Sequence, residues 1–205
     1  MGDNQYRREG FCVDPLSEAE IRAAAERLRT VLYDGGHKYV DIIDLVERKM
    51  PILFENFRFE VVAENELPDR EAEFNPYEFC LRVREEVYEK AFARDGHCRF
   101  TIAHELGHFF LHRNQTLAFA RYSENGEIPL FRNSEWQADV FARHLLVPLE
   151  MARDMTAASI AVVFEVSLEV AKIVREKADE QFAIAPAFPQ RTRQGLLPGL
   201  NWNWL

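Results

Sequence analysis

Residues 101–112 read TIAHELGHFFLH and place His104, Glu105 and His108 in the spacing HExxH. On an α-helix the two histidines lie one turn apart on one face, so both imidazoles can reach a single tetrahedral zinc ion at about 2.0–2.1 Å. Glu105 projects beside them, where it can take a proton from a zinc-bound water instead of binding the metal. Because the flanking residues are apolar, the pattern predicts a mostly buried helix that carries a metal site.

A bare HExxH pattern is short, and the alternative is a buried helix in which both histidines are hydrogen-bonded core residues. Gly107 lies inside the motif, although glycine lowers helix propensity by about 1 kcal/mol relative to alanine. Such a glycine indicates close packing or a need for space above the metal. A credible third ligand would favour the metal site.

The third ligand can be sought at the spacings that known zinc peptidases use. The metzincin spacing requires a histidine ten residues after His104, but that position is Asn114, and His112 comes too early. Glu127 has a spacing found in some gluzincins, but it lies in SENGEIP, which is typical of a loop. A rigid ligand is not expected there.

Glu135 is the third ligand that the sequence favours. It lies in NSEWQADVFARHLLVP, where Asn133 or Ser134 can cap a helix whose apolar residues follow helical spacing. A ligand on a second packed helix is held by both cores and leaves one coordination position open for water. Asp139, one turn after Glu135, can orient a ligating imidazole as a hydrogen-bond acceptor or pair with Arg143 on the helix surface.

Three segments of the sequence together resemble the ImmA/IrrE family of bacterial and phage metallopeptidases: RFTIAHELGHFFLH, the ExxAD pattern that starts at Glu135, and FEVSLEVAKIVREK. The similarity covers roughly residues 38–178. It implies a zincin-like, gluzincin-type α+β domain, mostly helical, with a small antiparallel sheet beside the HExxH helix. It also implies Zn²⁺ bound by His104, His108 and Glu135, with Glu105 as general base.

The same resemblance implies a substrate class. Members of the family typically cut a repressor of the helix-turn-helix type, which releases transcription of stress or mobile-element genes. We therefore expect a zinc-dependent endopeptidase with such a repressor as its protein substrate, an expectation that rests on the resemblance alone.

The length bounds the domain organisation. With 205 residues, 47% of them hydrophobic, the chain can build one domain with a substantial core, but a second full domain is not expected. We predict an N-terminal extension with an amphipathic helix over residues 1–37, a metallopeptidase domain over 38–180 and a C-terminal tail over 181–205. The tail contains prolines and glycines and ends in NWNWL, and we expect this aromatic end to dock on its own domain first and on a partner second.

Composition indicates the setting. Cys12, Cys80 and Cys98 are an odd number of cysteines without paired spacing, and no apolar N-terminal stretch resembles a signal peptide or a membrane span. We expect a cytoplasmic protein that does not bind membranes, with Cys98 as a packing residue. The net charge of −9 disfavours direct DNA binding, because nonspecific affinity for DNA comes largely from lysine and arginine at phosphates.

The segment FEVSLEVAKIVREK has the residue pattern of a helix-turn-helix, in which Val166 and Ser167 would form the turn. An αα-hairpin that completes the protease core is the favoured interpretation, because the acidic composition supplies no obvious phosphate-binding face. Two other functions stay open: a noncatalytic metal-containing interaction protein and a DNA-binding regulatory protein. The intact Glu105 disfavours the first, and the acidic composition disfavours the second.

Two helices are predicted before the motif. Ser17 and Glu20 form a capping box for an amphipathic helix whose apolar stripe runs from Ile21 to Val31. A second helix is predicted over residues 40–50, and Pro51 is expected to stop it.

Two antiparallel strands are predicted where apolar and polar residues alternate, over residues 57–61 and 79–83. The acidic segment between them is interpreted as a solvated connection. The alternative is a sheet edge beside the cleft that binds an extended peptide as an added strand.

The predicted reaction is metal-assisted hydrolysis of a peptide bond, in which zinc activates a water and Glu105 passes its proton to the leaving amine. A further group normally stabilises the oxyanion, and the unassigned candidates are His97, His112, Tyr122, Arg143 and His144. The simplest interpretation of His112 is that it closes the helix through the C-terminal carbonyls. The substrate, the cleavage site, the activation trigger and the oligomeric state are not determined by the sequence.

Overall fold

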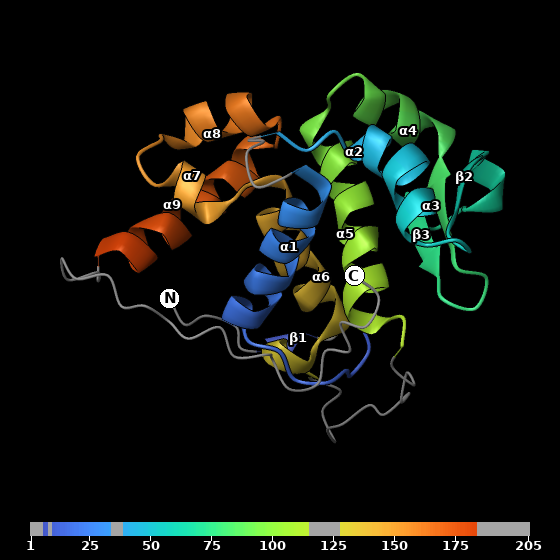
Figure 1. The fold of residues 1–205 in the computed structure, drawn as a ribbon, viewed down its shortest axis with the longest axis horizontal. Helices are drawn as coiled ribbons and strands as arrows, with labels where there is room; N and C mark the ends of the chain where they lie inside the picture. Colours follow the sequence, from blue (N-terminus) through green and yellow to red (C-terminus); the bar gives the residue numbers. More distant parts are fainter. Residues whose placement is uncertain (1–5, 8–9, 34–38, 115–127, 184–205) are drawn as a thin grey trace.

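The computed structural model describes residues 6–7, 10–33, 39–114 and 128–183, and Figure 1 shows their arrangement. The helices are α1 (Glu18–Tyr33), α2 (Ile42–Asp44), α3 (Met50–Leu53), α4 (Glu85–Phe92), α5 (Gly96–His112), α6 (Ser134–Leu146), α7 (Leu149–Ala152), α8 (Ala157–Phe164) and α9 (Leu168–Ala183). Helix α5 lies between α1 and α6 on one side and α2, α4 and the sheet on the other (Figure 1). The mostly helical architecture with a small sheet confirms the α+β class.

Some predictions fall outside the described residues. These are Glu127, Tyr122 and the aromatic C-terminal end. Helix α9 continues to Ala183, so the first residues of the predicted tail are helical.

Helix α1 begins with the predicted capping box. The Ser17 N–H donates to Glu20 Oε2 (2.8 Å), and the Glu20 N–H donates to Ser17 Oγ (3.3 Å). Ile21 and Leu28 are buried in the hydrophobic core, whereas Val31, at the C-terminal end of the predicted stripe, is exposed. Since α1 packs against α6, this helix supports the element that carries Glu135.

The second helix passes through Pro51 instead of stopping there, so that prediction was wrong. A π-helical turn, Leu45–Lys49, joins α2 to α3, and the Met50 N–H bonds Leu45 O, five residues earlier. Proline lacks an N–H, and its ring collides with the carbonyl four residues before it in a regular α-helix. In the structure Pro51 falls in the first turn of α3, where a missing N–H is tolerated.

The sheet is mixed, which corrects the predicted antiparallel pair. Its strands are β2 (Arg58–Val62), β3 (Ala72–Asn75) and β4 (Cys80–Arg84), in the order β2-β4-β3. Strands β2 and β4 are parallel, with Arg58 opposite Cys80, whereas β3 and β4 are antiparallel. The reason is that the acidic connection contains β3, which forms the hairpin with β4 and so returns the chain in the direction of β2.

The last two described helices, α8 and α9, form an αα-hairpin on the core, as the favoured interpretation of that segment predicts. Helix α8 ends at Glu165, which adopts a left-handed conformation with φ of 52°, and α9 follows. Phe164 and Val166 are buried in the core. Arg99 of α5 holds the turn against the core, because its Nε donates to Glu165 O (3.0 Å) and its Nη2 donates to Val40 O (3.0 Å).

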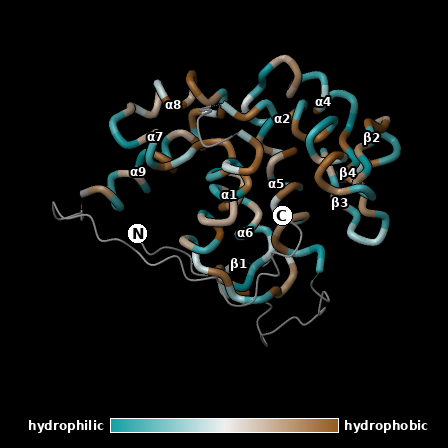
Figure 2. The backbone as a smooth tube through the Cα atoms, viewed as in Figure 1, coloured by the Kyte–Doolittle hydropathy of each residue, from teal (hydrophilic) through white to brown (hydrophobic). Residues whose placement is uncertain are grey.

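One hydrophobic core joins residues from Leu16 to Ala178. Figure 2 shows hydrophobic and hydrophilic residues alternating along α5 and the strands. The divisions predicted at residues 37 and 180 stay predictions. No helix of the described segments is long and apolar enough to cross a bilayer, and the cytoplasmic location also stays a prediction.

Two short strands lie at the end of α6 that carries Glu135. Strand β1 (Tyr6–Arg7) pairs antiparallel with β5 (Ile128–Pro129). Cys12 forms an isolated bridge with Asn133. Cys12, Cys80 and Cys98 are all buried and unpaired, in agreement with the interpretation of Cys98 as a packing residue.

The contact between α1, α6 and α9 predicts a pH-dependent stability. Glu18 Oε1 lies 3.6 Å from His144 Nε2, and Glu18 Oε2 lies 3.5 Å from Lys177 Nζ. The interaction with His144, helped by Lys177, outweighs burial and lowers the pKa of Glu18 from 4.5 to about 2. A lowered pKa stabilises the fold above the unfolded-state value, and this stabilisation is lost as the pH falls through the folded-state value.

We therefore expect Glu18→Gln to lower the free energy of unfolding near neutral pH by up to about 1 kcal/mol, the range of a partly exposed ion pair. The difference from the wild type should shrink as the pH falls from 4.5 towards about 2. Urea unfolding over a pH series measures it, with exposed Glu55→Gln as the control. A difference that stays constant with pH would contradict the assignment.

Candidate metal centre

Helix α5 carries the HExxH motif and is buried on most faces, as predicted. Asp95 caps its first turn by accepting the Cys98 N–H (2.9 Å). Ile102, Leu106 and Phe109 are fully buried around the motif. The apolar faces of the helix therefore fix the direction in which its histidines point.

Helix α6 brings Glu135 to the site from a distant part of the chain. Asn133 is the N-cap, because its Oδ1 accepts the Trp136 N–H (2.9 Å). This decides between the two capping residues that the sequence left open. Glu135 lies in the first turn, and the helix ends at Leu146, before Pro148.

The two helices touch at Gly107. A Cβ at this position would lie 2.9 Å from Ala138 Cα and 3.0 Å from Ala138 O, both backbone atoms of α6. Of the two reasons expected for this glycine, close packing is therefore the one that the structure gives. The absence of a side chain lets α6 approach closely enough for Glu135 to reach the histidines of α5.

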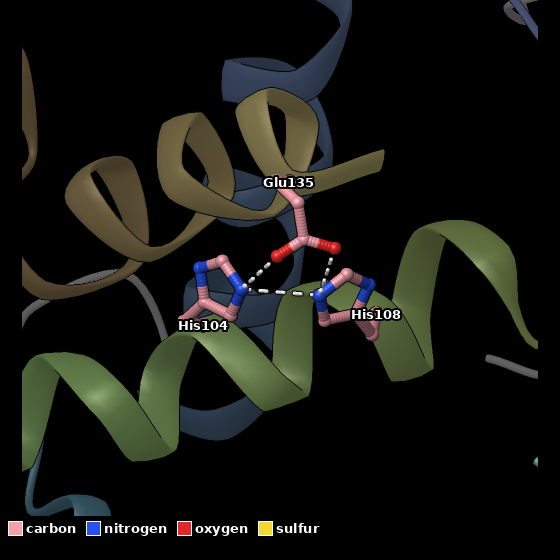
Figure 3. Close-up of side chains that lie close together, drawn as sticks. All are labelled: His104, His108 and Glu135. Carbon is pink, nitrogen blue, oxygen red and sulfur yellow. Dashed lines mark hydrogen bonds and ion pairs between the residues drawn. The ribbon is translucent and has the colours of Figure 1, made fainter. Parts of the chain in front are cut away.

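Three side chains converge where the helices meet (Figure 3). His104 Nε2 lies 3.0 Å from His108 Nε2 and 3.2 Å from Glu135 Oε2, and His108 Nε2 lies 3.5 Å from Glu135 Oε1. Ligand atoms at about 2.0–2.1 Å from a tetrahedral ion lie roughly 3.3–3.4 Å from one another. The three side chains thus offer ligand atoms close enough together to hold one metal ion.

The electrostatics of this cluster favour a positive charge. Burial alone would lower the pKa of His104, but hydrogen bonds to Asp139 and Glu135 raise it to about 10. Burial likewise opposes ionisation of Glu135, but the two histidines hold its pKa well below the usual range. A proton on His104 therefore supplies the positive charge beside Glu135 that a bound metal cation would supply instead.

Asp139 contacts the first histidine. Its Oδ1 lies 2.9 Å from His104 Nδ1, the ring nitrogen that faces away from the cluster. A carboxylate there accepts the Nδ1–H and leaves Nε2 free to bind a metal. This is the contact that the orienting interpretation of Asp139 requires.

Glu105 lies beside the cluster and faces the sheet. Its Oε2 accepts the backbone N–H of Phe74 in β3 (2.7 Å). Burial raises the pKa of Glu105 against the opposing effect of His108 and His104. The edge strand thus fixes the carboxylate that the sequence identified as the candidate base.

A cavity of about 420 Å³ opens onto the site. Glu105, His108 and Glu135 line it together with residues of β3 and of the N-terminal segment. Gly10 has a φ of +97°, and a Cβ on it would lie 2.8 Å from Glu135 Cγ. In the sequence only the glycine before FCV marks this wall, so its contribution was missed.

His112 does not have the simple helix-closing role that was expected. It is buried, its Nδ1 lies 3.1 Å from His108 Nδ1, and its Nε2 lies 2.9 Å from Gln137 Oε1. Burial lowers the pKa of His112 to about 3, so its ring is neutral. Gln137 was not identified from the sequence, where one glutamine in an amphipathic helix carries no signal of its own.

The other oxyanion candidates lie elsewhere. His97 is exposed and pairs with Glu71, and His144 faces Glu18. Of the five residues considered, His112 is the one that lines the cavity in the described part of the chain.

Comparison with known proteins bears on these residues. Residues 74–173 match the model of a family described as IrrE N-terminal-like domain, Peptidase_M78. No curated protein and no solved structure matched the chain. The matched region contains α5 and α6, and it confirms the resemblance inferred from the sequence.

The helix contact predicts the effect of a single methyl group. Gly107→Ala should destabilise the protein by up to about 2 kcal/mol, because overpacking costs about 1–3 kcal/mol and better helix propensity returns about 1 kcal/mol. It should also weaken metal binding, because α6 must move away with Glu135. Denaturant unfolding and metal titration measure the two effects.

The double variant Gly107→Ala/Ala138→Gly is the control. The nearest atoms to the added methyl are backbone atoms of residue 138, so removing the Ala138 side chain should not restore wild-type behaviour. A Gly107→Ala protein with wild-type stability and metal affinity would show that the close approach does not position Glu135.

Proposed function

We propose that this chain, whose residues 74–173 belong to the ImmA/IrrE peptidase family, is a zinc-dependent endopeptidase of the gluzincin type. The observation that carries the proposal is the convergence of His104, His108 and Glu135 from two helices, with Glu105 beside them on the wall of a cavity. Family membership supports a peptidase, and the donor set supports a metal-dependent one.

The donor set fits Zn²⁺. Two imidazoles and one carboxylate are the ligands of several catalytic zinc sites, and three protein ligands leave a position for water or substrate. His108 and Glu135 line the cavity, so an open position can face it. Bound there, zinc would supply a Lewis acid and an activated water.

Glu105 is the proposed general base. The Phe74 N–H holds its Oε2, which fixes the orientation of the carboxylate towards the cavity. A raised pKa brings it closer to the range in which a carboxylate can both accept a proton and return it. Glu105 thus takes the proton of the attacking water and delivers it to the leaving amine.

The edge strand β3 is the proposed binding site for the substrate backbone. The Phe74 N–H points away from β4, since it bonds Glu105. Backbone groups alternate in direction along a strand, so those of Ala72 point the same way as those of Phe74. Both residues line the cavity, where an extended peptide can add as a further strand.

The proposed substrate is a helix-turn-helix repressor present in the cytoplasm, and its cleavage would relieve repression in a stress or mobile-element response. The support is the family membership of residues 74–173. Direct DNA binding by the chain is not part of the proposal, because its net charge is −9.

Native mass spectrometry combined with cleavage assays tests this function. We expect one zinc per chain in the wild type, loss of zinc in Glu135→Ala, and retention in Glu105→Gln and Glu127→Ala. Glu105→Gln should lower cleavage of a candidate repressor by at least about 10²-fold, the usual contribution of a general base.

Three outcomes would contradict the proposal in different ways. A wild type without metal would exclude the metal centre. Loss of zinc in Glu127→Ala alone would move the third ligand to Glu127. Undiminished cleavage by Glu105→Gln would remove Glu105 from the chemistry. Bound zinc without cleavage of the candidate repressor would favour the noncatalytic alternative.

A further inference from the structure

A buried row of hydrogen-bonding groups leads from the backbone to one of the proposed zinc ligands. Gln137 Nε2 donates to Asp14 O and to Phe131 O, each at 2.9 Å, and its Oε1 lies 2.9 Å from His112 Nε2. His112 Nδ1 then lies 3.1 Å from His108 Nδ1. Gln137 is fully buried and His112 is buried.

The direction of each hydrogen bond in this row follows from its first member. Backbone carbonyls can only accept, so the two carbonyls at one end of the Gln137 amide determine which end is the NH₂ group. The carbonyl oxygen of Gln137 must then face His112. An oxygen there requires that His112 Nε2 carries its proton.

The second step assigns the ring of His112. A neutral imidazole has one N–H and one acceptor nitrogen, so Nδ1 of His112 accepts. A charged ring is disfavoured because His112 is buried and no carboxylate of the described residues contacts either of its ring nitrogens, whose partners are an amide and another imidazole. The proton between the two histidines therefore belongs to His108 Nδ1.

We propose, on the premise of the zinc centre proposed above, that His112 and Gln137 are positioning residues that hold His108 in its Nδ1–H tautomer, so that Nε2 presents its lone pair to the metal. The opposite tautomer would place a proton on Nε2, where it would block coordination. Both ring nitrogens of His112 already have partners in this row, so His112 acts through His108 and not on the reacting groups.

The two histidine ligands are thus oriented by different chemistry. His104 gives its Nδ1–H to the carboxylate of Asp139, whereas His108 gives its Nδ1–H to a neutral imidazole. Asp139 and Gln137 both lie on α6, which also carries Glu135. Helix α6 therefore supplies one proposed ligand and orients the two histidine ligands. It orients His104 directly through Asp139, and it orients His108 through Gln137 and His112.

The test compares two identical substitutions, His112→Phe and His144→Phe. Both histidines are buried, but His144 faces Glu18 and not the metal site. ¹⁵N NMR of the imidazoles in metal-free protein reports the His108 tautomer, and competition with a chelator reports zinc affinity. The wild type should show the Nδ1–H form of His108.

We expect His112→Phe to populate the Nε2–H form of His108 and to weaken zinc binding by about 10- to 100-fold, the usual effect of losing a group that orients a ligand. His144→Phe should leave both readouts unchanged, although it makes the same replacement of a buried imidazole by a phenyl ring. An Nε2–H form in the wild type, or an unchanged tautomer and zinc affinity in His112→Phe, would overturn the proposal.

A second pair keeps the test decisive if His112→Phe does not fold. In Gln137→Glu, burial against two backbone carbonyls keeps the carboxyl protonated, so it can donate to a carbonyl and still offer an oxygen acceptor to His112. The Nδ1–H form of His108 should therefore persist. Gln137→Met removes that acceptor at similar size and should release the tautomer. Equal tautomer populations in the two variants would contradict the relay, by which we mean the control of the His108 tautomer by Gln137 through His112.

Failure of the relay can be told apart from failure of the proposed function. The tautomer is measured in metal-free protein and without substrate. A wild type that holds the Nδ1–H form but binds no zinc would contradict the metal centre and leave the relay intact. A wild type that binds zinc, but whose metal-free form has His108 protonated on Nε2, would contradict the proposed role of His112 and Gln137 and leave the metal centre intact.

Discussion

The close approach of α5 and α6 at Gly107 is the constraint on which the site depends. The backbone of Ala138 occupies the space that a side chain at residue 107 would need. The axes of two packed helices normally lie about 8–10 Å apart, depending on the side chains between them. A glycine at the contact permits the smaller of these distances. This contact brings a glutamate on one helix to two histidines on the other, a group that could hold one metal ion. The same contact brings Asp139 and Gln137 of α6 to the outer nitrogens of the histidine cluster.

A buried polar site of this kind is stable only if its groups are hydrogen-bonded. Here the partners come from five parts of the chain: α5, α6, the edge strand through the Phe74 N–H, the N-terminal segment through Asp14 O, and the turn before α6 through Phe131 O. The N-terminal segment packs on Glu135 at Gly10 and forms part of the cavity wall. Segments that the sequence shows as separate therefore meet at one site, and each satisfies a donor or an acceptor there.

The sequence was most informative where the chemistry is local. The HExxH spacing, the cap before Glu135 and the capping box at Ser17 all depend on residues within about one turn of each other, and the structure has each of them in place. The errors concern elements whose form depends on distant partners. Pro51 was expected to end a helix, but a π-helical turn lets the helix continue. The predicted antiparallel pairing of the two strands was wrong because the segment between them, interpreted as a connection, contains β3. A strand of four residues is too short for its alternation of apolar and polar residues to be recognised.

The sequence by itself determined the residue types of the candidate centre, because two histidines and a glutamate at helical spacing restrict the chemistry to a few possibilities. It also determined that Glu135 would begin a second helix. Only the tertiary structure decided how the histidines are held: His112 and Gln137 are separated by 25 positions, and Gln137 and Asp14 by 123. Hydrogen-bond direction across such separations depends on which buried groups meet when the core packs. No spacing rule contains that information.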